Sequence, residues 1–306
     1  KYTDELKNAN GEVDEALYRQ LNCDKEWEYI QKHPPQTLND LESHVKKYMG
    51  QHTIPQGITW PPVVSKILSE EMTTTNGLIY DHIKYSNCSN GREIAKQFIN
   101  NEISPLNFHL CALMRLLREI KRTNYAKFSP TTYGHHQLEL PLGMVKREIK
   151  NVIYSWTAFH TPELKNKANA IDILEKHYNI NINTGENELY LREYNDLTSR
   201  TYARLHHDAS MYNYDAGNYG VMDQGANPNQ FTLLLYVDYS EEGVGGGTVF
   251  PFAGIHLQPV TDSALLFANY DLDGLPNYKA EHLVPHLTQG VKTIVSVGFS
   301  VEPVAR

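Results

Sequence analysis

Residues 231–251 read FTLLLYVDYSEEGVGGGTVFP, and this stretch indicates the fold of the second half of the chain. An apolar run of strand type ends in acidic residues and glycines, and a second short apolar run follows, which is the pattern of two strands joined by a turn. Three glycines occupy positions 245–247, but no helix is expected after them, so a phosphate-binding loop is not supported. The segment therefore predicts a tight β turn.

Runs of the same kind lie on both sides of this stretch. After residue 185 the chain contains strand-type segments separated by Gly, Asn, Asp and Pro, which read ELYLREY, FTLLLYVDY, GTVFPF, ALLFANY and KTIVSVGFSV. Short strands at this spacing, with turn residues between them, are typical of antiparallel sandwiches and barrels. We therefore expect an α+β fold whose core is a jelly roll, that is, a double-stranded β-helix.

The part of the chain before these strands has the periodicity of helices. In residues 38–49 and 107–122 apolar side chains recur at intervals of three and four, and prolines separate the segments. A further helix is expected over residues 162–178, with Pro162 at its start. We expect a helical N-terminal region of unknown role over residues 1–125, and a second domain over residues 126–306.

Charge and composition exclude several classes of function. The 28 basic and 36 acidic residues give a net charge of -8, and the basic residues are scattered, so nucleic acid is not an expected partner. No apolar run is long enough to span a bilayer. The three cysteines lack metal-site spacing, which argues against a zinc site or a dense disulfide framework. We expect the secretory or endomembrane lumen rather than the cytoplasm; the oligomeric state stays open.

A candidate metal site lies in residues 202–212, YARLHHDASMY. Alternate residues of a strand share a face, so His206 and Asp208 point the same way while His207 points to the other face. Two histidines and one carboxylate form the facial triad of non-heme Fe(II) oxygenases. A second histidine is therefore required downstream.

Residues 281–299, EHLVPHLTQGVKTIVSVGF, offer that histidine at His282 and begin a strand at Lys292. In this strand Lys292, Ile294, Ser296 and Gly298 share one face, and the opposite face is an apolar stripe. A lysine on the inward face of a barrel is unfavourable unless an anion pairs with it. A dicarboxylate such as 2-oxoglutarate would supply that anion.

Taken in order, these blocks resemble the catalytic domain of prolyl 4-hydroxylase-like Fe(II)/2-oxoglutarate-dependent dioxygenases. The resemblance extends over roughly residues 150–303, from ENELYLREY through the His206 and Asp208 pair, residues 231–251 and ALLFANYDLDG to Lys292. It implies that His206, Asp208 and His282 bind Fe(II). It also implies that Lys292 pairs with the distal carboxylate of 2-oxoglutarate, and that O2 is the second co-substrate and ascorbate a further cofactor.

The same resemblance places two hydroxyl groups, those of Tyr194 and Thr232, near 2-oxoglutarate. Three departures bear on the site. The segment between Tyr194 and His206 is longer than in the family, which puts the reach of Tyr194 in doubt. Pro285 lies one residue early, which leaves His286 as a rival to His282. Gly298 stands where the family has a tryptophan, so a wider substrate pocket is expected.

The function implied by the resemblance is hydroxylation of a peptidyl residue, proline first and lysine second, with a peptide or protein as partner. The alternatives are a hydroxylase of a free amino acid or small metabolite, and a β-barrel binding or structural protein without turnover. Residues 211–230, rich in Tyr, Asn, Gly and Asp, are interpreted either as a lid or substrate rim, or as an ordinary surface insertion. The pair His135 and His136 is expected at the surface.

Overall fold

The computed structural model describes residues 51–52, 58–85, 88–131, 134–165, 167, 169–184, 188–195, 203–208, 210–213, 218–221, 229–275 and 277–303. The helices are α3 (Pro62–Lys66), η2 (Ile67–Glu71), α4 (Gly91–Ile99), α5 (Pro105–Asn124), η3 (Tyr125–Lys127), α6 (Leu142–Phe159), α7 (Ala170–Lys176) and η4 (Tyr278–Ala280). The helix expected over residues 38–49 lies outside the described residues.

Half of the described strands belong to one large antiparallel sheet with the order β2-β3-β15-β11-β18-β7-β5-β4, to which β6 is added through β18. Their bounds are β2 (Thr73–Thr75), β3 (Leu78–Lys84), β4 (Ser129–Pro130), β5 (His136–Glu139), β6 (Ile180–Asn183), β7 (Tyr190–Tyr194), β11 (Phe231–Tyr239), β15 (Ser263–Ala268) and β18 (Lys292–Pro303). Strand β3 comes from the region expected to be helical, so both sides of the expected boundary at residue 125 contribute to this sheet.

A second sheet has the order β14-β13-β16-β8, with β8 (Ala203–His206), β13 (Thr248–Phe250), β14 (Ile255–Leu257) and β16 (His282–Val284). Two small sheets complete the described strands. They contain β1 (Gln51–His52), β9 (Ser210–Asn213) and β10 (Asn218–Val221) in one, and β12 (Val244–Gly245) and β17 (Leu287–Gln289) in the other. The α+β class is thus confirmed, and among the described strands no sheet closes into a barrel.

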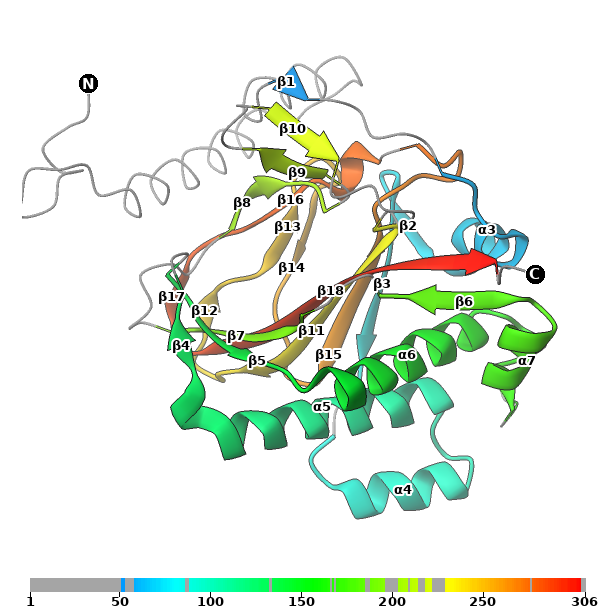
Figure 1. The fold of residues 1–306 in the computed structure, drawn as a ribbon, viewed down its shortest axis with the longest axis horizontal. Coiled ribbons are helices and arrows are strands. Elements are labelled where there is room, and N and C mark those ends of the chain that lie inside the picture. Colours follow the sequence, from blue (N-terminus) through cyan, green and yellow to red (C-terminus); the bar gives the residue numbers. More distant parts are fainter. Residues whose placement is uncertain are drawn as a thin grey trace, which may run out of the picture.

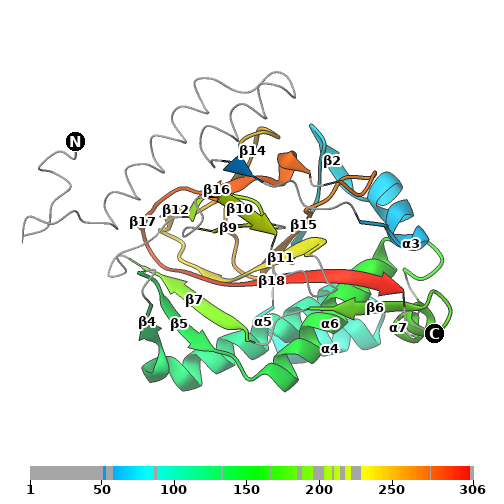
Figure 2. The ribbon, with the colours of Figure 1, turned by 45° about the horizontal axis from the view of Figure 1, so that its top comes forward.

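Helices and the second sheet lie on opposite sides of the large sheet. Figure 1 shows α4 to α7 on one side and the strands β8, β13 and β16 on the other, and Figure 2 shows the same arrangement for β16. Helix α5 begins as its sequence dictates, because the side chain of Ser104 accepts a hydrogen bond from the backbone N–H of Asn107 and a proline takes the first helical position. Helix α7 is shorter than expected, since residues 162–165 form turns instead.

Alternation along the two central strands separates the core from the site. On β11, Phe231, Leu233, Leu235 and Val237 pack into the main core with α5 and α6. On β18, Val295, Val297, Phe299 and Val301 do the same. The residues between them face the second sheet, as expected for Lys292, Ile294 and Ser296. Burying one apolar face against helices therefore leaves the other face of each strand available for polar side chains.

A half-buried cation, Lys121, connects α5 to the helix-side face of the sheet. The ammonium group of Lys121 lies 2.9 Å from Glu193 Oε2 and donates a hydrogen bond of 2.7 Å to the hydroxyl of Thr293. Glu193 precedes Tyr194 and Thr293 follows Lys292, so these contacts lie on the opposite side of the sheet from those two residues. The cluster consequently supports the inward orientation of Tyr194 and Lys292.

A disulfide joins Cys88, which follows β3, to Cys111 in α5, and both cysteines are fully buried. The sequence analysis did not anticipate this pairing, because a separation of 23 residues carries no spacing signal. The bond encloses α4 in a covalent loop and connects it to the core helix.

Replacing both cysteines with serine is expected to reduce the free energy of unfolding by about 3 kcal/mol, because the unfolded chain regains the entropy of an open loop. Urea unfolding at equilibrium would measure the loss. Wild-type protein treated with a thiol reductant should lose a similar amount, whereas the double variant should not respond to the reductant. Equal stability of all four samples would contradict the disulfide.

Candidate metal centre

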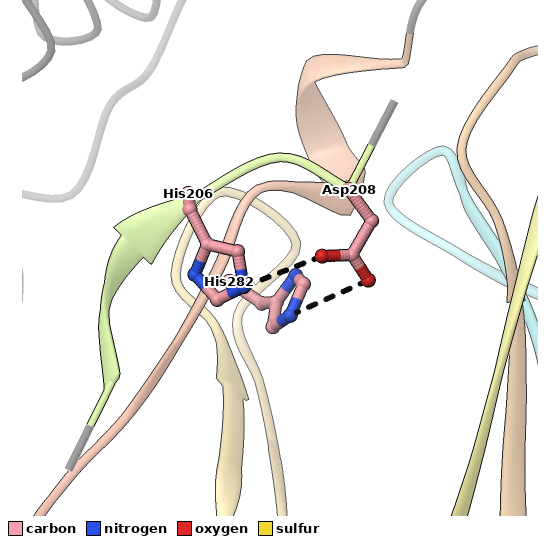
Figure 3. A group of neighbouring side chains, drawn as sticks. All are labelled: His206, Asp208 and His282. Carbon is pink, nitrogen blue, oxygen red and sulfur yellow. Dashed lines mark ion pairs between the residues drawn. The ribbon is translucent and has the colours of Figure 1, made fainter. Parts of the chain in front are cut away.

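Three side chains from neighbouring strands converge at one end of the second sheet. His206 ends β8, Asp208 follows two residues later, and His282 begins β16 directly opposite His206 in the antiparallel pair. Figure 3 shows the two imidazole rings and the carboxylate pointing toward one another. The expected pairing of His206 with Asp208 and the choice of His282 thus bring three donor groups together, although the second histidine lies far away in the sequence.

The geometry of this group fits one metal ion. Asp208 Oδ1 lies 3.3 Å from Nε2 of His206, and Oδ2 lies 3.9 Å from Nε2 of His282. The ligand atoms all lie within 4.8 Å of one another. Adjacent ligands at about 2.1 Å from a metal are about 3 Å apart, so small side-chain adjustments suffice for all three to reach one ion.

His282 is oriented and kept neutral by its surroundings. Its Nδ1 donates a hydrogen bond of 3.0 Å to the backbone carbonyl of Ala280, which leaves the Nε2 lone pair directed into the site. Burial, followed by the nearby His206, lowers the pKa of His282 to about 4. An imidazole that is neutral at pH 7 is the form that binds metals.

Asp208 is held as a carboxylate. Burial alone would raise its pKa, but His282, His206 and the hydroxyl of Thr232 outweigh burial and bring the pKa below its usual range. Thr232 donates a hydrogen bond of 2.7 Å to Asp208 Oδ2, and the amide of Asn269 donates one of 3.1 Å to the same hydroxyl oxygen. Thr232 thus lies inward, as expected, but its hydroxyl is engaged with the candidate metal ligand.

Thr232→Val is expected to weaken metal binding roughly 10- to 100-fold, because it removes the hydrogen bond that orients the Asp208 carboxylate. A chelator-competition titration would measure metal affinity, and 2-oxoglutarate affinity would be measured separately on metal-saturated protein. Thr248→Val is the matched control, since its buried hydroxyl bonds the phenol of Tyr236 at 2.6 Å. If Thr232→Val weakens 2-oxoglutarate binding alone, the hydroxyl acts on the co-substrate instead.

A cavity of about 160 Å³ extends from this centre between the two sheets. Its walls combine the three donor groups with residues of β7, β11, β15 and β18. The residues that line it are Arg192, Tyr194, Ala203, His206, Asp208, Thr232, Leu234, Tyr236, Thr248, Phe267, His282, Val284, Lys292, Ile294 and Ser296. All six residues expected at the site therefore face one cavity.

Lys292 is the most deeply buried charged group of that cavity, with 3% of its surface exposed. Its ammonium group donates a hydrogen bond of 2.9 Å to the carbonyl of Gly246 and lies 4.9 Å from the centre of the Tyr194 ring. Within the described part of the chain no carboxylate pairs with it. Burial lowers the pKa of Lys292 to about 7, so the site is suited to an anionic ligand that would restore its charge.

Tyr194 reaches the cavity despite the longer segment that follows it. It pairs with Lys292 across β7 and β18, which fixes the two side chains beside each other. The ring of His135 packs against Tyr194 with 5.2 Å between the ring centres. His135 is buried, so the expectation of a surface position was wrong for this residue, because β5 lies against β7.

The remaining histidines of the two motifs lie outside the donor group. His207, which directly follows β8, is buried, and its Nε2 lies 3.0 Å from the carbonyl of Asn277. His286 neither joins the donor group nor lines the cavity. Of the expected lid over residues 211–230, the backbone of β9 and β10 forms an antiparallel pair. The rest, up to residue 228, lies outside the described residues.

The wider pocket expected at Gly298 is not found next to the backbone. A Cβ atom at this position would lie 2.3 Å from the side-chain oxygen of Asn229, so Asn229 fills the space beside the glycine. This contact could not be predicted from the sequence, because only the pairing of β11 with β18 brings the two residues together.

Two further charged residues near the site escaped sequence analysis. Glu281 is fully buried, and burial followed by the nearby Asp208 raises its pKa well above the usual value, which favours the neutral acid. Arg192 lines the cavity from β7. The sequence YLREY could have predicted this position, because Arg192 lies two residues before Tyr194 and residues two apart on a strand share a face.

Comparison with known proteins places this chain near one group of solved structures. A viral collagen prolyl hydroxylase of Paramecium bursaria Chlorella virus-1 is 16% identical (TM-score 0.40, 72% of this chain, 94% of that one). A Pseudomonas putida prolyl-4-hydroxylase is 11% identical (0.40, 77% and 97%). A Burkholderia pseudomallei oxidoreductase of the 2OG-Fe(II) oxygenase family is 9% identical (0.38, 82% and 94%). No protein-family model and no curated protein matches the sequence.

The names of these structures agree with the resemblance seen in the sequence. At such TM-scores and identities we infer the function from the residues of the site alone.

Proposed function

We propose that this chain is an Fe(II)- and 2-oxoglutarate-dependent dioxygenase that hydroxylates a peptidyl residue, proline first and lysine second. The observation that carries the proposal is the presence of a two-histidine, one-carboxylate donor set and a buried lysine without a carboxylate partner among the described residues, in one cavity. The donor set fits Fe(II), and the buried lysine fits the distal carboxylate of a dicarboxylic acid.

The donor chemistry favours iron over the common alternatives. Two imidazoles and one carboxylate on one side of an ion leave other positions open, as non-heme Fe(II) oxygenases require. When bound, Fe(II) would supply the activation of O2 that is coupled to decarboxylation of 2-oxoglutarate. Within the chain, Thr232 and the carbonyl of Ala280 orient the candidate ligands, and ascorbate is the reductant we expect to sustain turnover.

The candidate binding site for 2-oxoglutarate follows the direction of β18. Lys292 marks the deep end and the donor group lies at the level of Thr232, which pairs with Gly298 at the other end of the same inward face. Ile294 and Ser296 line the cavity between them, and apolar Leu234 and Phe267 add to its wall. We assign Lys292 and Tyr194 to the distal carboxylate, because they lie side by side.

The proposal also covers the jelly-roll core, the bounds of the catalytic domain and the cellular compartment. The large sheet and the four-stranded sheet are taken as the two halves of a double-stranded β-helix, with the cavity between them. The catalytic domain is assigned to residues 126–306, with β3 and α5 of the earlier region completing its sheet and core. A buried disulfide supports an oxidising compartment such as the endomembrane lumen. No described helix is long and apolar enough to cross a membrane.

The test is an anaerobic titration of purified protein with Fe(II) and 2-oxoglutarate, monitored by visible absorption. A weak charge-transfer band that requires both additions is the expected result. Peptides containing proline or lysine would then be screened for stimulation of succinate release. Absence of the band in folded, metal-loaded protein would instead favour a binding protein without turnover.

A further inference from the structure

The cavity contains a second cation for which the proposed reaction has no use. Arg192 lies on β7, two residues before Tyr194 and on the same face, and it pairs with Ile294 of β18. Among the described residues, no hydrogen bond or ion pair engages its guanidinium group. Asp208 is the one carboxylate among the residues that line the cavity, and it belongs to the donor group.

The two cations lie at different depths. Lys292 is buried, whereas Arg192 is half-buried. Among the described strands, β7 pairs with β18 only from Lys292 to Ile294 and β6 pairs with it from Ser300, so no described strand pairs with residues 295–299 of β18 on the side of Arg192. Arg192 therefore lies nearer to solvent than Lys292, on the same wall of the cavity.

Lys292 and Arg192 differ in burial and in the anion that each can bind. A co-substrate that occupies the deep end neutralises Lys292 and leaves the guanidinium without a counter-ion. A half-buried guanidinium group is best compensated by a planar anion, because it can donate two parallel hydrogen bonds to a carboxylate. The free charge is thus available to the second ligand of the reaction.

We propose that Arg192 forms an anion subsite that binds a carboxylate carried by the substrate. This inference rests on the proposed function, and it narrows the substrate to one with a carboxylate close to the hydroxylated atom. Two sources share this chemistry. One is the α-carboxylate of a free amino acid, and the other is an acidic side chain next to the target residue in a peptide.

The test uses protein loaded with Zn(II), which does not turn over, and saturated with 2-oxoglutarate. Sodium propionate is added as the anionic probe and propionamide as its uncharged counterpart, and the guanidinium signal of Arg192 is followed by nuclear magnetic resonance. We expect propionate to saturate one site and propionamide to leave the signal unchanged. Arg192→Gln should weaken propionate binding at least tenfold, with less than a twofold change in 2-oxoglutarate affinity, and Arg192→Lys should recover part of the loss.

Two results would overturn the inference. If Arg192→Gln weakens 2-oxoglutarate binding as strongly as Lys292→Met, the guanidinium belongs to the co-substrate site. If propionate and propionamide act alike, Arg192 is a solvated side chain at the rim. Competition against propionate by L-proline and by N-acetyl-L-aspartic acid amide distinguishes the two carboxylate sources. Should wild-type protein fail to bind 2-oxoglutarate, the proposed function fails, and the propionate titration of Zn(II)-loaded protein still tests the subsite.

Discussion

Asp208→Ala abolishes iron binding and 2-oxoglutarate turnover, and this is the largest effect that we expect of any single substitution. The Asp208 carboxylate is the one anionic donor of the group and faces both histidines. Without it two neutral imidazoles remain, and metal affinity should fall by at least about 100-fold, more than the loss of an orienting partner produces. Chelator competition measures the affinity, and succinate release measures the turnover.

His207→Ala is the matched control for this substitution. His207 is adjacent to both proposed ligands, yet its ring points away and bonds the carbonyl of Asn277. The variant should lose stability but keep its iron affinity within a few-fold of the wild type. A rival assignment predicts a different pattern: if His286→Ala removes iron binding and His282→Ala does not, the distal ligand is His286.

Lys292→Met is expected to weaken 2-oxoglutarate binding about 100-fold while metal affinity stays unchanged. Removing one partner of a buried charge pair costs about 2–5 kcal/mol, because the other charge is left without compensation. Calorimetric titration of metal-loaded protein under argon would measure the change. The exposed Lys84→Met serves as control and should bind like the wild type. Equal 2-oxoglutarate affinity in all three proteins would remove Lys292 from the proposed site.

The same lysine predicts a pH dependence. Burial lowers its pKa to about 7, so above pH 7 the free protein holds a neutral amine that must take up a proton when the dicarboxylate binds. The dissociation constant of 2-oxoglutarate should therefore rise by up to about tenfold per pH unit above pH 7 and level off below it. In Lys292→Met this slope should disappear, and its persistence there would assign the proton to another group.

The stability of the ligand-free protein should change with pH for the same reason. The pKa of Lys292 is about 7 in the folded protein, whereas an unperturbed lysine, as in the unfolded chain, has a pKa of 10.5. Between these two pH values the unfolded chain therefore binds one more proton than the folded protein. The free energy of unfolding then rises with pH across this window through this group. Lys292→Met should be more stable than the wild type at pH 7, and the difference should shrink toward pH 10.

Local sequence patterns were sufficient to predict the strands β7, β11, β13, β15 and β18 and the directions of side chains along them, but not the strands before residue 185, such as β3. Alternation is a property of a single extended segment, so the inward face of Lys292, Ile294 and Ser296 and the opposite directions of His206 and His207 could be assigned without knowing the neighbouring strands. Helix α5 was equally readable, because its periodicity and its Ser-Pro start are local. The same holds for the choice of Asp208 as partner of His206.

Contacts between distant segments could be decided only by the tertiary structure. The strand register placed His282 opposite His206, and the order of the sheet placed Arg192 and Tyr194 beside Lys292. The disulfide, the burial of His135 and the filling of the space at Gly298 by Asn229 likewise depend on contacts between segments far apart in the sequence. Sequence alone therefore determined which residue types could bind iron and a dicarboxylate, whereas long-range packing decided which of them share one cavity, because register is set by the burial of whole faces and not by neighbouring residues.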